Sequence, residues 1–153
     1  MKPLKTGAFC VLFSLCFYLG FAQQAPPITE PDYNKPKLFA SLPQSINIHL
    51  QSLESLFSLP EGKSVAIPLG SFSYNGVVVS KSDPSDKSVQ SIVIRSTNLP
   101  GAAFTFTKTI NSNGGVSFRG RIISREHSDA FELLEQNGQY TLTKKHQLKL
   151  MNE

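Results

Sequence analysis

Apolar and polar residues alternate with a period of two in the C-terminal half of the chain, which is typical of β-strands with one buried face. Two such runs, 102–110 and 116–124, flank Asn-Ser-Asn-Gly-Gly and predict a β-hairpin. The expected core face carries Phe104, Phe106, Val116, Phe118 and Ile122. The expected solvent face carries Thr105, Thr107, Ser117, Arg119 and Arg121.

Shorter alternating or β-rich runs indicate further strands, and turn residues separate them. The segment 81–88 has the Ser, Asp and Pro content of an exposed loop, and 98–101 turns the chain. Asn137-Gly138 marks a last hairpin, in which Phe131, Leu133, Tyr140 and Leu142 point inward. The additional strands are expected at 64–69, 88–95, 130–135 and 140–145.

The run 71–80 has two interpretations, because it contains Asn75-Gly76. This dipeptide indicates either a two-residue hairpin turn, which would pair Tyr74 with Val77 and Phe72 with Val79, or a bulge within a longer strand. We favour the hairpin.

The segment 45–59 shows a different period and predicts an amphipathic helix. Ile46, Leu50, Leu53 and Phe57 recur at intervals of four, three and four residues. Pro60-Glu61-Gly62 ends the pattern. The apolar stripe is expected to pack on the sheet of the same domain.

These elements predict a mainly β fold. Sequential hairpins favour an antiparallel sandwich or a partly open barrel, with one N-terminal amphipathic helix that covers a face or an open end.

The N-terminus has the layout of a secretory signal peptide. Lys2 and Lys5 precede an apolar run at 8–22, which is too short for a membrane-spanning helix, and Gly20 and Ala22 suit a cleavage site. The stretch 21–24, Phe-Ala-Gln-Gln, resembles export signals of gliding and gut-type Gram-negative bacteria. The expected organisation is a signal peptide at 1–22, a Pro-rich extended linker at 23–40 and one helix-plus-β domain at 41–153, exported to the periplasm, the cell surface or the medium.

Composition narrows the chemistry of the mature chain. Both cysteines, Cys10 and Cys16, lie in the segment expected to be removed, which leaves no disulfide or thiol site. Loss of Lys2 and Lys5 leaves 13 basic against 11 acidic residues, so the charge gives no case for nucleic acid. No later run is long enough for a transmembrane helix.

Catalytic motifs are weak in this sequence. His127, Ser128 and Asp129 are consecutive, and side chains of consecutive residues diverge, so a connecting turn is the better interpretation than a Ser-His-acid triad. Alanine at any of the three is expected to leave the fold nearly unaltered. His127 and Asp129 are too few to bind a metal, and His49 and His146 have no ligand spacing. We therefore expect no enzyme activity, no metal and no cofactor.

The most suggestive surface feature is a group of cations. Arg119 and Arg121 project from one strand face, with Arg125 and Lys108 expected nearby, and guanidinium groups suit an acidic glycan or an acidic protein. Alternatively, Glu132 on the following strand pairs with these arginines. The expected function is an exported noncatalytic binding or accessory module of the cell envelope or secretome, which recognises a polymer or a protein. The alternative is a pro-region or inhibitor-like domain that acts on a secreted hydrolase.

Overall fold

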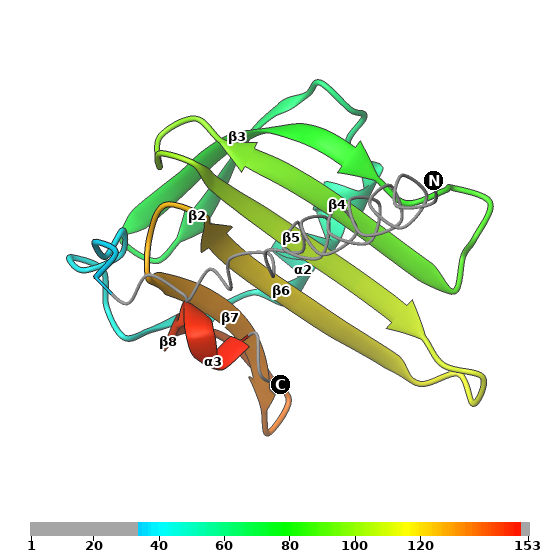
Figure 1. Ribbon diagram of the computed structural model, residues 1–153. Coiled ribbons are helices and arrows are strands. Elements are labelled where there is room, and N and C mark those ends of the chain that lie inside the picture. Colours follow the sequence, from blue (N-terminus) through cyan, green and yellow to red (C-terminus); the bar gives the residue numbers. More distant parts are fainter. Residues whose placement is uncertain (1–33, 151–153) are drawn as a thin grey trace, which may run out of the picture. The chain divides into compact units, whose positions relative to one another are not determined.

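The structure is a computed structural model that describes residues 34–150, and its main feature is one curled antiparallel sheet (Figure 1). The signal peptide and most of the linker expected from the sequence lie outside the described residues. The strands are β1 (Ser45–Ile48), β2 (Ser64–Leu69), β3 (Phe72–Lys81), β4 (Val89–Ser96), β5 (Ala102–Ile110), β6 (Val116–Ser124), β7 (Asp129–Gln136) and β8 (Gln139–His146). The helices are α2 (Leu50–Glu54), the 3-10 turn η2 (Ser55–Ser58) and α3 (Gln147–Leu150).

The strand order is β1-β8-β7-β6-β5-β4-β3-β2, so every strand from β2 to β8 pairs with its neighbour in sequence. The sheet curls into a half-barrel, which confirms the prediction of a mainly β, antiparallel fold built from sequential hairpins. Of the two predicted alternatives, a sandwich or a partly open barrel, the structure has the second. The strands β1 and β2 lie at opposite edges of the sheet. The helical segment α2–η2 connects them and packs on the concave face, where Leu53 and Leu56 are buried.

The concave face carries the core. Phe104 and Phe106 of β5 are fully buried with Ile122 of β6, as the alternation predicted. Phe57 of η2 stacks on Phe106, with ring centroids 5.0 Å apart, so the helical segment contributes its apolar stripe to the core. The predicted last hairpin is also present, since Asn137 and Gly138 both have positive φ angles, as a type I′ turn requires.

The single helix expected at 45–59 is wrong in its first part. Residues Ser45–Ile48 form strand β1, which pairs with β8 from Ser45↔Thr143 to Ile48↔Tyr140. Helical structure begins only at Leu50, and it is one α-helical turn followed by one 3-10 turn. The edge of β8 offers hydrogen-bonding partners to this segment, and β-branched Ile46 and Ile48 suit an extended chain.

The hairpin expected at Asn75-Gly76 is also wrong, because both residues lie inside the ten-residue strand β3. The turn lies earlier, where Gly70 has a φ of 64° between β2 and β3. A bulge does interrupt β3, but the register shifts between Val78 and Ser80 rather than at Gly76. Gly76 has another role, since a Cβ atom there would lie 2.6 Å from the Arg95 carbonyl oxygen and 2.6 Å from Ile94 Cγ2.

This close approach predicts that Gly76→Ala lowers the free energy of unfolding by about 2 kcal/mol, because backbone of β4 has to move to admit a methyl group. Urea unfolding measures the effect. Gly115→Ala is the matched control, because its Cβ would meet side-chain atoms instead of backbone, with Asn113 Oδ1 at 3.1 Å and Asn111 Nδ2 at 3.7 Å, and these exposed side chains can shift. Equal stability losses in the two variants would contradict a steric role for Gly76.

Candidate ligand-binding site

The outer face of β5 and β6 holds two of the four predicted cations. Arg119 and Arg121 lie opposite Thr107 and Thr105 in the β5–β6 register, on the face turned away from the core. Together with Gly120 these four residues line a shallow hollow of about 210 Å³. The predicted solvent face of this hairpin is therefore present, and it presents guanidinium and hydroxyl groups side by side.

Arg121 is held by an acidic partner. Its Nε and Nη2 donate to Glu132 Oε1 at 3.1 and 2.9 Å, and Nη1 donates to the Leu150 carbonyl oxygen at 3.4 Å. The pairing with Glu132, one of the alternatives from the sequence, is thus formed. Arg119 is exposed and has no ion pair or side-chain hydrogen bond with any residue between 34 and 150. The two arginines differ accordingly, since Arg119 alone offers an unoccupied guanidinium.

The structure does not bring Lys108 to this surface, contrary to the expectation. Lys108 shares its strand face with Phe104 and Phe106, because residues two and four positions apart point the same way. Its Nζ lies 2.9 Å from Glu54 Oε1 and 5.6 Å from the centre of the Phe118 ring, on the concave side. Lys108 therefore anchors α2 to the sheet.

Arg125 lies apart from the other cations. It is exposed in the turn after β6, and its carbonyl oxygen accepts a hydrogen bond from Lys35 Nζ at 2.8 Å. Arg119 and Arg121 therefore form the arginine surface without Lys108 or Arg125.

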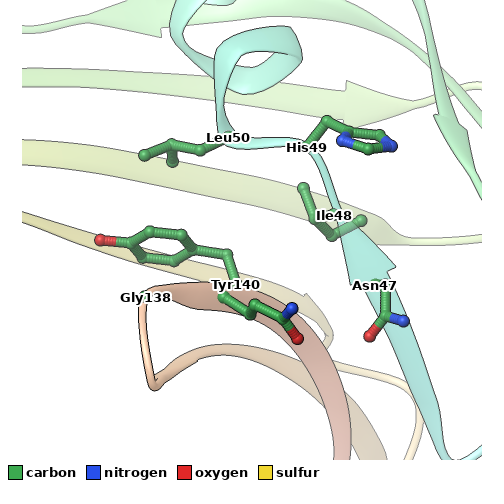
Figure 2. Close-up of a pocket in the computed structure, with 7 residues that line it drawn as sticks. Asn47, Ile48, His49, Leu50, Gly138 and Tyr140 are labelled. Atoms are coloured by element: carbon green, nitrogen blue, oxygen red, sulfur yellow. The ribbon is translucent and has the colours of Figure 1, made fainter.

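A second concavity lies where β1 meets the turn between β7 and β8 (Figure 2). Its volume is about 420 Å³. Figure 2 shows Leu50 and Tyr140 pointing to one side, whereas the His49 ring points to the other. This pocket is lined by two segments that lie about 90 positions apart in the sequence, so the sequence alone did not predict it. The lining residues are Asn47, Ile48, His49, Leu50, Gly138, Gln139 and Tyr140.

Tyr140 connects this pocket to β6. Its ring meets that of Phe118 edge-on, with centroids 5.8 Å apart, and its hydroxyl donates to Glu135 Oε2 at 2.9 Å. Burial raises the pKa of Tyr140 to about 12, and the Glu135 carboxylate adds to the shift by disfavouring a phenolate. Tyr140 therefore stays a neutral phenol at physiological pH and provides a flat apolar surface rather than a base.

The segment 125–129 forms the turn that the sequence predicted. His127 Nδ1 lies 2.8 Å from Ser124 Oγ, but Ser124 is fully buried and its hydroxyl also reaches the Pro100 carbonyl oxygen at 3.2 Å. A serine without solvent access offers no nucleophile to a substrate. This Ser-His pair holds two turns together.

Asp129 has a structural role that the sequence did not reveal. It is 4% exposed, and its Oδ1 and Oδ2 accept hydrogen bonds from the backbone N–H groups of Leu38 and Phe39 at 2.7 and 2.9 Å. Phe39 is fully buried against Phe131, with ring centroids 4.9 Å apart. The end of the segment expected as linker, up to residue 40, therefore packs on β7.

Among residues 34–150, no group of three or more His, Cys, Asp or Glu side chains is arranged to hold a metal ion. Over the same part of the chain, no helix is long and apolar enough to cross a bilayer. Comparisons of the chain with protein-family models, with curated proteins and with solved structures give no match. A function must therefore be inferred from the residues and their arrangement.

Proposed function

We propose that the protein is an exported, noncatalytic binding module that holds an acidic ligand on the outer face of β5 and β6. The observation that carries the proposal is the exposed guanidinium of Arg119, which lacks a partner among residues 34–150 and lies beside Thr107 and Arg121 in a shallow hollow. A guanidinium group makes paired, charge-assisted hydrogen bonds with carboxylate, sulfate or phosphate groups. Neighbouring threonine hydroxyls add donors and acceptors.

The hollow suits a chain-like ligand better than an isolated ion. Residues two positions apart on a strand are about 7 Å apart. Arg119 and Arg121 thus present two cationic groups in a row, although Glu132 neutralises much of the charge on Arg121. A shallow exposed site gives weak affinity per contact, so several repeating acidic groups are needed for useful binding.

The N-terminus and the polar side chains support the other parts of the proposal. The signal-like segment at 1–22 favours a location in the periplasm, at the cell surface or in the medium. The Ser124 hydroxyl is buried and Tyr140 is held neutral, so neither provides an accessible nucleophile or base. These features favour binding without catalysis.

Thermal unfolding of residues 23–153 with polygalacturonate, polyglutamate and neutral dextran tests this function. A ligand that binds only the native state stabilises it by about 2.7 kcal/mol at a concentration 100 times its Kd. We expect the acidic polymers, but not dextran, to raise the Tm, and Arg119→Ala to abolish the rise.

Arg95→Ala is the matched control, because Arg95 is also an exposed sheet arginine and lies outside the hollow. Its removal lowers the net charge equally and should leave the response intact. An identical loss in both variants would reduce the effect to net charge and contradict the proposed site. Inhibition of a co-secreted protease by the wild-type domain would instead favour an inhibitor.

A further inference from the structure

Strand β6 pairs with β5 along its whole length but with β7 only over its C-terminal part. All nine residues of β6 pair with β5, from Val116↔Ile110 to Ser124↔Ala102. On its other side only Arg121, Ile122 and Ile123 pair with β7. Figure 1 shows β6 and β7 diverging beyond this point. The segment Val116–Gly120 is therefore a strand edge inside the sheet, with no strand paired to it from β7.

At Gly120, next to the last residue paired with β7, strand β6 still lies close to β7. A Cβ atom at this glycine would lie 3.2 Å from Leu133 Cβ. Beyond it, the Phe118 ring meets Tyr140 of β8. Val116, which the sequence placed in the core, is 47% exposed because none of the strands between residues 34 and 150 covers this end of β6.

The unpaired edge presents backbone hydrogen-bonding groups. The Asn111 N–H donates to the Gly115 carbonyl oxygen, across the hairpin. The Ile110 N–H donates to the Ser88 carbonyl oxygen, on the β4 side and away from β6. In an antiparallel ladder such directions alternate along the strand. The N–H and C=O groups of Val116 and Phe118 consequently point away from β5. They lie on the side of β6 on which β7 pairs only with Arg121–Ile123.

We propose that this edge binds an extended acidic peptide, which adds to β6 as an antiparallel strand. This inference rests on the proposed function and names its ligand class. Side chains of an added strand alternate between the two faces. Those on the outer face meet Arg119, and those on the concave face meet the apolar surface of Val116 and Phe118. The recognised sequence therefore alternates acidic and apolar residues.

Charge decides between this peptide and a second copy of the protein. If two β6 edges paired with each other, the Arg119 side chains of both copies would lie close together on one face. No carboxylate would separate these two charges, because Glu132 is already bound to Arg121. Like charges across strands are unfavourable, whereas an acidic strand supplies the missing partner.

The probe for this site is a fluorescein-labelled, acetylated hexapeptide that alternates Glu and Val, and fluorescence anisotropy with residues 23–153 measures its Kd. Val116→Pro removes the outward N–H at the first position of β6, where proline is tolerated. We expect it to weaken binding about tenfold. Val116→Ala keeps that N–H and loses only part of the apolar contact, so we expect it to weaken binding by no more than about threefold. Equal effects of the two variants would overturn strand addition.

Modified probes keep the test independent of the stability of Val116→Pro. In the added strand, valine N–H groups face β6 and glutamate N–H groups face away. N-methylation of the valines should abolish binding to the wild-type protein, and N-methylation of the glutamates should leave it measurable. Equal binding of both modified probes contradicts the inference.

Other outcomes separate this inference from the proposed function. Arg119-dependent binding of polygalacturonate, without binding of the hexapeptide, keeps the function and overturns the peptide. Binding of neither acidic polymer nor peptide overturns both. Dimerisation that Val116→Pro abolishes would identify a second copy as the occupant. Tighter binding of a synthetic 23–33 peptide than of the probe would identify the chain's own leader.

Discussion

Replacing Phe106 by alanine is expected to lower the free energy of unfolding by about 4 kcal/mol, the range for a large core side chain that leaves a cavity. Phe106 is fully buried at the centre of a row of rings. Its centroid lies 5.0 Å from that of Phe57, 6.1 Å from that of Phe104 and 5.9 Å from that of Phe118. The substitution removes apolar burial and three ring contacts at once, including the ring on which Phe57 of η2 stacks.

Phe118→Ala is the matched control for this prediction. Phe118 lies in the same row of rings but is only half-buried, because it belongs to the part of β6 that is not paired with β7. We expect a loss of about 2 kcal/mol, because less apolar surface is re-exposed and no closed cavity forms. Urea unfolding with unchanged m-values measures both variants. A Phe106 variant no less stable than the Phe118 variant would contradict the assignment of Phe106 to the centre of the core.

Local patterns predicted most of the sheet. The alternation in β5 and β6 gave the buried faces of Phe104, Phe106 and Ile122, because the pleat links sequence parity directly to the two sides of a strand. Asn137-Gly138 marked its turn because two consecutive positive φ angles suit these residues. Where strand neighbours follow each other in sequence, such information is sufficient for the topology.

The errors occur where distant segments decide the structure. Ile46 points into the core in the observed strand and would do so in the predicted helix, so the apolar stripe cannot separate the two. The deciding partner of β1 is β8, about 95 positions away. Gly76 suggested a turn, although its small size serves the close approach of β4. A glycine signal alone does not distinguish these two roles.

The same limit applies to the candidate site. Parity along β6 predicted that Arg119 and Arg121 share the outer face, and cross-strand pairing with Glu132 was foreseeable. Lys108 was grouped with them by chain proximity, but its own parity places it on the concave face beside Phe118. The free edge of β6 was not predictable, because the alternation of a strand is unchanged whether or not a neighbour pairs with it.

Replacing Asp129 by alanine is expected to lower the free energy of unfolding by about 3 kcal/mol, in contrast to the near-neutral effect that the sequence suggested. The carboxylate is 4% exposed and accepts from the Leu38 and Phe39 N–H groups. Without it, the buried N–H of Phe39 has no acceptor, and the segment that covers Phe131 loses its anchor. An unpaired buried donor costs more than the hydrogen bond contributes when it is formed.

Ser128→Ala provides the comparison at the neighbouring position. The Ser128 hydroxyl makes only a 3.4 Å contact with the Pro36 carbonyl oxygen, and the backbone N–H that binds the same oxygen at 3.0 Å is retained. We expect a loss of about 0.5 kcal/mol. Hydrogen exchange adds a local measurement, because the amides of Leu38 and Phe39 should lose protection in Asp129→Ala before the rest of the sheet does. If their protection is unchanged, the carboxylate does not anchor this segment, and Phe39 is held by its packing in the core.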